Sequence, residues 1–482
     1  MINTALVSWK AFGPIVPEMF LVCIGIFLIG LDIFAPKRRQ LLPWLTVIGC
    51  LGALLMVAGE HNVVGFDGMI IADSYGAFFK VICLLGVILA SLMSEHFRNS
   101  EGLKQGEYYS LMIFSAVGML LMASAGDLMV LYLGLELMAL SIYCLVGLPR
   151  HDGRAAEAAM KYLLMGGFAS AILLYGISIV YGLTGTTNIA KIAEYTVSGN
   201  LLHNPALIAG LGLMIAAFCF KVAIAPFHFW TPDVYEGAPT AITAFMSVGP
   251  KAAGFAVFGR VLFTGFPQFH DQWGILLSSL ALLTMAIGNI TALSQTSIKR
   301  MLAYSAIAHA GYSLLGVLSG TAEGLSATMT YLLTYGFMNM GAFAILVLLA
   351  GGPDNRRESL EDYKGLAKTN PMAALLMLIF MFSLTGLPPT AGFIGKFYLL
   401  KAALGAGYTM TVIGLVIFSS ISAFFYLRVV RYMYMDDPGE ELKLEFTPGI
   451  SAVLGIALLG VIGIGLLPGS VVGQAASALL GQ

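Results

Sequence analysis

Four ionisable side chains stand inside long apolar runs of the sequence, where a charge is unfavourable. Glu136 lies within LGLELMALSIY, Lys221 ends an apolar run, Lys251 lies in GPKAAGF, and Lys396 follows GLPPTAGFIG. A charge at the centre of a membrane span costs about 2.5 to 3.5 kcal/mol on insertion scales, so the four oppose insertion by on the order of 10 to 14 kcal/mol. Because this is as large as the net stability of a typical domain, these residues indicate function rather than packing.

Proton transfer is the chemistry that these residue types favour. The proton affinity of a lysine responds strongly to burial and to a nearby carboxylate, so a lysine that an acid approaches and leaves can exchange a proton near neutral pH. We expect Glu136 to modulate Lys221, Lys251 to carry protons laterally, and Lys396 to exchange them with the far side of the membrane. The alternative is that these charges pair and hold helices together, although one glutamate cannot pair with three lysines.

Three further residues are candidate relays. Lys161 follows Glu157 at a spacing of four, so it is either half of a surface helical pair or part of the proton path. His228 and His309 suit a relay because a free histidine titrates near neutral pH. An intramembrane histidine is also often a hydrogen-bonded link between helices, and the sequence leaves both interpretations open.

The stretch 220–251 predicts a helix that breaks at membrane depth. Pro226 and Pro232 remove backbone donors and bar a regular helix between two apolar segments. Unwound backbone is tolerated in a bilayer where it lines protein or water, which is typical of an ion path. Asp233 and Glu236 lie in this stretch near the inner aqueous rim, where they serve either proton entry or simple solvation.

Composition predicts an all-α polytopic membrane protein. The 482 residues are 58% hydrophobic and 11% charged, whereas a soluble domain is about one-quarter charged. The net charge of −1 gives no basic field for nucleic acid. The sequence has no Gly-rich nucleotide motif, and its five cysteines are scattered in apolar segments as small buried hydrophobes: Cys23, Cys50, Cys83, Cys144 and Cys219.

A length of about 20 apolar residues per span gives about fourteen transmembrane helices. The first run is followed by Lys37, Arg38 and Arg39, as a retained span is, and lacks the basic region that precedes a cleaved signal. We predict spans near residues 15–35, 41–58, 75–93, 108–124, 127–148, 157–183, 205–225, 241–264, 274–295, 301–320, 325–350, 372–402, 409–433 and 447–467.

Basic residues favour one side of the membrane. The connections after spans one, three, five, nine, eleven and thirteen are basic, and those after spans two, four, ten and twelve carry almost no Lys or Arg. By the positive-inside rule the odd-numbered connections are cytoplasmic, so both termini face outward. Lys191 and Arg260 are exceptions. The basic residues on the odd-numbered connections are Lys37, Arg38, Arg39, Arg98, Lys104, Arg150, Arg154, Lys299, Arg300, Arg356, Arg357, Lys364, Lys368, Arg431 and Lys443.

The intramembrane charges recur at a common offset. Glu136 and His309 are 173 positions apart (309 − 136), Lys221 and Lys396 are 175 apart (396 − 221), and Lys251 and Arg428 are 177 apart (428 − 251). This offset equals five spans, an odd number, so the second copy enters the membrane from the opposite side.

The sequence therefore predicts two inverted five-helix repeats, with broken helices as spans 7 and 12. The second break falls in 386–400, where Pro388 and Pro389 precede Lys396. We divide the chain into an N-terminal three-helix segment (1–105), two repeats (106–268 and 269–435) and a C-terminal helix (436–482).

At these residues the sequence closely resembles the antiporter-like membrane subunits of respiratory complex I, the proton-pumping NADH:quinone oxidoreductase. The resemblance covers essentially the whole chain. It implies fourteen spans, inverted repeats, broken helices 7 and 12, and proton transfer through Glu136, Lys221, Lys251 and Lys396. The motifs that carry it are LGLELMALSIY, FKVAIAPFHFWTPDVYEGAPT, GPKAAGF, MLAYSAIAHAGY and GLPPTAGFIGKFYLL.

Within this family the chain looks most like the subunit N branch. Lys396 argues against the M branch, which usually has glutamate there, and Lys251 argues against the L branch, which usually has histidine. The chain also ends soon after span fourteen, whereas L-like subunits extend into a long lateral helix. Arg428 matches no family position, so its role rests on the repeat alone.

The resemblance implies a non-redox subunit of a translocase in the cell inner (plasma) membrane, with both termini on the periplasmic side. FMN, iron-sulfur clusters, NADH and quinone are implied in partner subunits, with no cofactor or metal in this chain. Its implied partners are antiporter-like and small membrane subunits, and lipid. The alternatives are a subunit of a multisubunit cation/proton antiporter or of a hydrogenase-type complex. Sodium transport favours a cluster of carboxylates and carbonyls, whereas this chain offers lysines.

Overall fold

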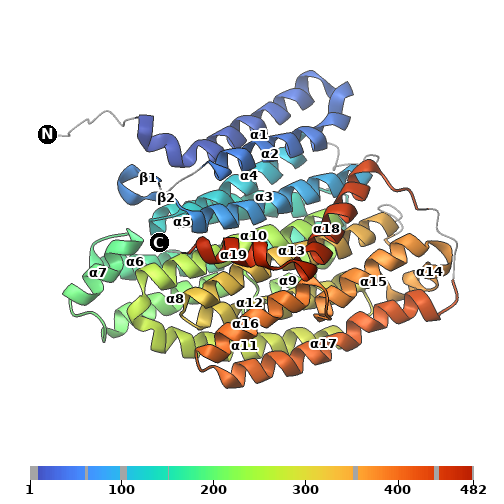
Figure 1. The fold of residues 1–482 in the computed structure, drawn as a ribbon. Helices are drawn as coiled ribbons and strands as arrows, with labels where there is room; N and C mark the ends of the chain where they lie inside the picture. The colour runs from blue at the N-terminus through green and yellow to red at the C-terminus, as the bar shows by residue number, and fades with distance from the viewer. Residues whose placement is uncertain are drawn as a thin grey trace.

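The computed structural model describes residues 9–59, 63–97, 106–149, 151–350, 356–438 and 444–479. Four basic residues used above to predict orientation, Arg98, Lys104, Arg150 and Lys443, lie outside these ranges. Within them the chain is a bundle of helices that run side by side, with one short pair of strands (Figure 1). The all-α prediction is confirmed.

The helices are α1 (Val16–Phe34), α2 (Leu42–Ala58), α3 (Ser74–Ser94), α4 (Gly106–Ser124), α5 (Leu128–Val146), α6 (Gly153–Thr184), α7 (Ile189–Ser198), α8 (Pro205–Lys221), α9 (Trp230–Gly237), α10 (Thr240–Arg260), α11 (His270–Leu293), α12 (Ile298–Leu318), α13 (Ala322–Leu349), α14 (Leu366–Thr369), α15 (Pro371–Thr385), α16 (Ala391–Gly405), α17 (Thr409–Met435), α18 (Pro448–Leu466) and α19 (Gly469–Ser477). Strands β1 (Val63–Gly65) and β2 (Ile70–Ala72) pair antiparallel. Short 3-10 helices and a π-helical turn, Val261–Gly265, link several helices.

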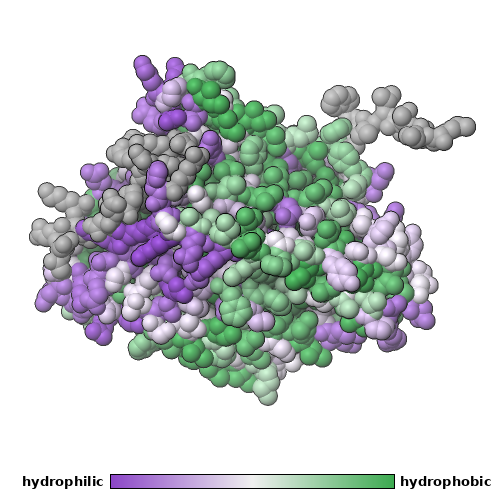
Figure 2. Space-filling view, turned by 180° about the vertical axis from the view of Figure 1, so that it is seen from behind, coloured by the Kyte–Doolittle hydropathy of each residue, from purple (hydrophilic) through white to green (hydrophobic). Residues whose placement is uncertain are grey.

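Twelve of the described helical segments are long and apolar enough to cross a membrane. Two shorter apolar helices, α8 and α15, are each followed across a break by a second helix, α9 and α16. When each broken pair is counted as one span, the total is the fourteen that hydropathy predicts. Figure 2 shows a band of hydrophobic residues across one face, with hydrophilic residues gathered toward the ends. The protein is therefore a multi-pass membrane protein.

Polar caps fix where the helices begin. The Asp127 carboxylate accepts from the Met129 N–H at the start of α5, and Asp152, Asn204 and Ser297 cap α6, α8 and α12 in the same way. Each cap satisfies a backbone donor that the first turn leaves free. The caps thus end the loops within a few residues, which keeps the connections short.

The connections lie at the two ends of the bundle. The β1–β2 hairpin and α7 lie at one end and α14 at the other (Figure 1). An isolated bridge between Asp127 and Asn188 joins the start of α5 to the start of α7. The predicted basic connections include the segment that carries α14, so this is the end for which the sequence predicts a cytoplasmic location.

Two five-helix repeats follow the N-terminal helices. The first comprises α4, α5, α6, the broken span α8/α9, and α10; the second comprises α11, α12, α13, the broken span α15/α16, and α17. Each repeat opens on a pair of helices in close contact, α4 with α5 and α11 with α12. A Cβ added at Gly118 would lie 2.5 Å from the Gly134 carbonyl oxygen, and one at Gly288 would lie 2.6 Å from the Ala308 nitrogen. Glycine therefore permits the same close approach in both repeats.

Candidate functional site

The first break separates α8 from α9. Lys221 is the last residue of α8, and the chain then turns through Ala223, whose φ of 62° is a conformation that L residues rarely adopt. Such backbone costs about 1 to 3 kcal/mol and is concentrated at functional sites. The N–H of Ala225 donates to the Thr284 hydroxyl of α11 (3.0 Å), so a backbone group freed by the break is satisfied.

Only one of the two prolines predicted to interrupt this span lies in the break. Pro226 lies between α8 and α9, as predicted. Pro232 lies inside the first turn of α9, so the expectation that it bars a helix is wrong. In the first turn of a helix the missing N–H has no intrahelical partner to lose.

The second break separates α15 from α16, and Lys396 lies against it. The chain turns at Gly386 (φ 92°), and the Lys396 ammonium group donates to the carbonyl oxygens of Leu384 (3.0 Å) and Thr385 (2.8 Å) and to the Ser419 hydroxyl (2.8 Å). These carbonyls are the last of α15, which carry the negative end of that half-helix dipole. Among the described residues, no carboxylate forms an ion pair with this buried lysine.

Lys221 is buried and its ammonium group has no hydrogen-bond partner among the described residues. It lies 6.0 Å from the centre of the Tyr143 ring and within electrostatic range of Glu136. The Glu136 carboxylate instead accepts a hydrogen bond from the Ser170 hydroxyl of α6. Glu136 and Lys221 thus lie within electrostatic range of each other, with no direct hydrogen bond or ion pair between them among the described residues.

A continuous row of polar and aromatic side chains joins Lys251 to Lys396. Lys251 donates to the Ala306 carbonyl oxygen (2.5 Å) and lies 5.6 Å from the centre of the Tyr335 ring. Tyr335 contacts His309, which contacts Tyr312, with centroids 4.8 and 5.4 Å apart. The Lys396 ammonium group lies 5.0 Å from the Tyr312 ring. His309 thus lies between the two lysines.

His309 is bonded through both ring nitrogens. Its Nδ1 lies 2.6 Å from the Tyr331 hydroxyl and its Nε2 3.1 Å from the Tyr426 hydroxyl, which in turn bonds Ser305 (2.5 Å). Sequence reasoning missed these tyrosines, because aromatic residues occur throughout the spans and nothing in their spacing marks them. Both interpretations of His309, helix link and relay, are compatible with this geometry.

Two other pairs of buried charges are neutralised. Lys80 of α3 pairs with Glu18 of α1 (2.9 Å), and Arg260 of α10 binds Asp73 through two bonds of 2.8 Å. Among the described residues, by contrast, Lys221, Lys251 and Lys396 form no ion pair with a carboxylate. Among the buried lysines that the structure describes, those without a carboxylate partner are therefore the three predicted ones.

Lys161 and the acidic residues of the first break form a network at the rim. Lys161 bonds both Glu157 and Asp233 at 2.8 Å, and Arg300 bonds Asp233 (3.2 Å) and Glu236 (2.6 Å). The side chains of Lys161 and Asp233 are more than a third exposed, so this network meets solvent. Lys161 does not lie in the buried row.

The remaining predicted residues lie apart from that row. His228 is buried in the first break and stacks on Phe229, and its Nδ1 has no partner among the described residues. Arg428 donates to the carbonyl oxygens of Leu293 (2.9 Å) and Gln295 (2.7 Å), so it satisfies the end of α11. Although the repeat offset relates Arg428 to Lys251, its side chain lies at the end of α11 and not in the row.

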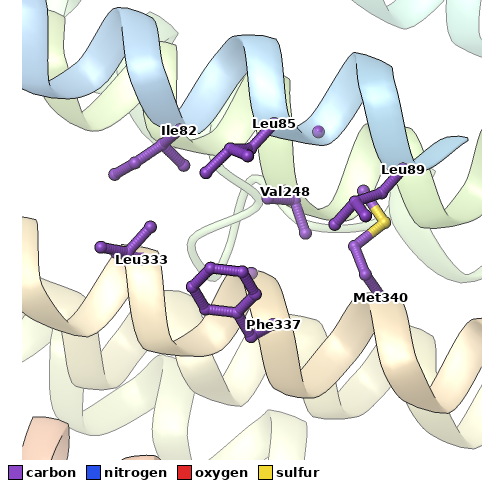
Figure 3. A pocket seen from close by; sticks show the side chains of 9 residues that line it. Ile82, Leu85, Leu89, Val248, Leu333, Phe337 and Met340 are labelled. Carbon is purple, nitrogen blue, oxygen red and sulfur yellow. The ribbon is translucent and has the colours of Figure 1, made fainter. Parts of the chain in front are cut away.

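Two cavities differ sharply in character. One, between α3, α10 and α13, measures about 10 Å³ and is lined by apolar side chains such as Ile82, Val248 and Phe337 (Figure 3). A space of this size and polarity stays dry. The other, about 210 Å³, lies among connections on the predicted cytoplasmic side. It is lined by Arg154, Glu236, Thr296, Ser297, Arg356, Glu358 and Ser359.

Lys299, which sequence reasoning placed only in a basic loop, is buried beside the polar cavity. Its ammonium group donates to the Ala238 carbonyl oxygen (2.7 Å) and to Glu358 (3.1 Å).

Comparison with known proteins identifies the family. The model of a family described as NADH:quinone oxidoreductase/Mrp antiporter, TM, matches residues 125–425. The NADH-quinone oxidoreductase subunit N of Desulfovibrio desulfuricans is 51% identical over 475 residues, and the match covers 94% of each chain.

Solved structures show the same fold. A chain of respiratory complex I from Thermus thermophilus with bound aureothin is 33% identical, with a TM-score of 0.79 over 95% of this chain and 99% of that one. A chain of the Mrp complex from Dietzia sp. DQ12-45-1b has a TM-score of 0.82 over 98% of both chains at 21% identity, which shows a shared fold alone. The predicted resemblance is confirmed: this chain belongs to the NADH:quinone oxidoreductase/Mrp antiporter transmembrane family, in its subunit N group.

Proposed function

We propose that this chain translocates protons as a non-redox membrane subunit of NADH:quinone oxidoreductase, the enzyme for which its relatives are named. Oxidation of NADH and reduction of quinone take place in partner subunits, which hold FMN and iron-sulfur clusters. The lack of a nucleotide-binding glycine motif and of paired cysteines in the sequence supports this division of labour. The partners are the other membrane subunits of the complex.

The observation that carries the proposal is the row from Lys251 to Lys396. If the buried lysines only held helices together, each would have a carboxylate partner, as Lys80 and Arg260 do. Lys251 and Lys396 are instead bonded to carbonyl and hydroxyl oxygens. These oxygens are neutral. They hydrogen-bond the ammonium group but supply no negative charge that would hold its proton as a carboxylate does, so the lysine can release the proton.

Each residue has a defined part in this path. Glu136 sets the proton affinity of Lys221 by its distance, because a carboxylate nearby favours the charged lysine. Lys251 passes protons along the repeat boundary through His309, whose two nitrogens can accept and donate in turn. Lys396 exchanges protons with the outer side at the second break. His228 and the Lys161 network lie on the approach from the inner rim.

The location follows from the charge pattern and the family. We place the chain in the cell inner (plasma) membrane with both termini on the periplasmic side, because the basic connections are odd-numbered. Exposed apolar side chains on α6, such as Leu164 and Phe168, supply surface for lipid or for a neighbouring membrane subunit.

The test is to replace Lys221 or Lys396 by alanine in the complete complex. Proton pumping driven by NADH in membrane vesicles should be abolished in both variants, while native gels show normal assembly. Lys191→Ala, on the exposed face of α7, is the matched control and should pump normally. Full pumping by both buried variants would overturn the proposal.

A further inference from the structure

Helix α6 holds the carboxylate that regulates the first lysine. Ser170 is buried on α6, and its hydroxyl donates to Glu136 of α5. A hydrogen bond from a hydroxyl to an ionised carboxylate is among the stronger ones in proteins. The Lys221 ammonium group, although buried nearby on α8, has no hydrogen-bond partner among the described residues. The acid within electrostatic range of Lys221 is therefore hydrogen-bonded to α6 and not to the lysine.

Tyr143 occupies the space beside Lys221. It follows Glu136 by seven residues, so both side chains lie on one face of α5. Its ring lies 6.0 Å from the Lys221 ammonium group, and its hydroxyl is buried without a partner among the described residues. A Cβ at Gly166 of α6 would overlap this hydroxyl. The small residue on α6 thus lets the tyrosine ring lie close to that helix.

Three residues of α6 form one contact face toward α5. Tyr162, Gly166 and Ser170 recur at a spacing of four, which places them in a row on the helix. Tyr162 meets Tyr143 edge to face, with centroids 4.6 Å apart. This face fixes the position of Tyr143 through Tyr162 and Gly166, and the position of Glu136 through Ser170.

We infer that Ser170 is a positioning residue that holds the Glu136 carboxylate on α6, away from a direct ion pair with Lys221. Without the hydroxyl, the carboxylate is free to bond the unpartnered ammonium group. The lysine then retains its proton and the transfer step slows. This inference rests on the proposed function. It names Ser170 as the residue that keeps proton binding by Lys221 reversible.

The experiment compares Ser170→Ala, Glu136→Gln and the double variant in the assembled complex, with NADH-driven proton uptake by vesicles as the readout. Ser170→Ala should lower the rate about tenfold, the size expected for one lost bond to a charged group. In the Glu136→Gln background the same substitution should have no further effect, because its target is already changed. Ser170→Thr, which keeps the hydroxyl, should restore the rate.

Ser141→Ala is the matched control, since that buried hydroxyl of α5 bonds the Leu137 carbonyl of its own helix; it should pump normally. An additive loss in the double variant would show a merely structural serine and overturn the inference. Normal pumping by Ser170→Ala with impaired Glu136→Gln would also overturn it and leave the proposed function standing. Normal pumping by Glu136→Gln would overturn both. If Ser170→Ala does not assemble, Ser170→Cys, a weaker donor, takes its place.

Discussion

The ammonium group of Lys396 lies 2.8 Å from the carbonyl oxygen of Thr385, across the second break of the chain. The same group therefore caps the end of α15 and forms one end of the buried row. A cap needs charge and donors, whereas a proton carrier must also become neutral. These two roles can be separated by a residue that keeps its charge.

Lys396→Arg is such a substitution. Arginine keeps the positive charge and the donors that satisfy the α15 carbonyls, but it does not release its proton in a protein. We expect normal assembly with at least about a tenfold loss of NADH-driven proton pumping, measured by quenching of a pH-sensitive dye in vesicles. Retention of wild-type pumping by this variant would show that Lys396 acts as a cap alone.

Replacement of His309 tests the middle of the row. His309→Phe keeps a ring beside Tyr312 and Tyr335 but leaves the Tyr331 hydroxyl buried without its partner, at a cost of about 1 to 3 kcal/mol. We expect slower pumping and a modest fall in thermal stability. Tyr426→Phe removes the longer bond of His309, of 3.1 Å, together with the Tyr426–Ser305 bond, but it leaves the bond of His309 to Tyr331 intact. Pumping should therefore fall less than in His309→Phe. Equal pumping in His309→Phe and the unmodified complex would remove the histidine from the path.

Much of this architecture is visible in the sequence because it depends on local pattern. Long apolar runs give the spans, the prolines near 226 and 388 give the two breaks, and ionisable residues in apolar context give Glu136 and the lysines. The repeat offset then relates Lys221 to Lys396. The apolar runs, the prolines and the buried charges are recognised from nearby residues, and the offset from residue numbers alone. None of them requires knowledge of how the helices pack.

The contacts between helices could not be read in the same way. Tyr312 follows His309 by three residues on α12, so helix periodicity alone brings their rings together. Tyr335 comes from α13, and only packing brings its ring to His309. The ion pair of Glu18 with Lys80 was also missed, since neither residue has a partner in the repeat. The sequence does contain a sign of this ion pair. Glu18 and Lys80 carry opposite charges and lie near the starts of spans one and three, which enter the membrane from the same side.

That ion pair gives a prediction about stability. Because both side chains are almost fully buried, removal of Glu18 breaks a buried ion pair, which costs about 3 to 5 kcal/mol. Glu18→Gln should therefore lower the temperature at which heated complex loses this subunit, without changing the protons pumped per NADH in the complex that remains. Glu18→Gln combined with Lys80→Met should recover part of the loss. A double variant less stable than the sum of its single variants would contradict this assignment.

The glycine contacts between α4 and α5 give the last prediction. A Cβ at Gly118 would lie 2.5 Å from both the Gly134 carbonyl oxygen and the Met138 nitrogen, atoms that cannot move without the helix. Gly118→Ala should force the helices apart, destabilise the chain by about 1 to 3 kcal/mol and reduce the amount of assembled complex on native gels. Gly167→Ala is the matched control, because a Cβ there meets nothing within 4 Å. It should be neutral or slightly stabilising, since alanine favours a helix over glycine by about 0.5 to 1 kcal/mol. If both variants assemble equally well, the close approach at Gly118 does not hold α4 against α5. The matching contact of Gly288 with Ala308 would then not be a shared stabilising feature of the two repeats.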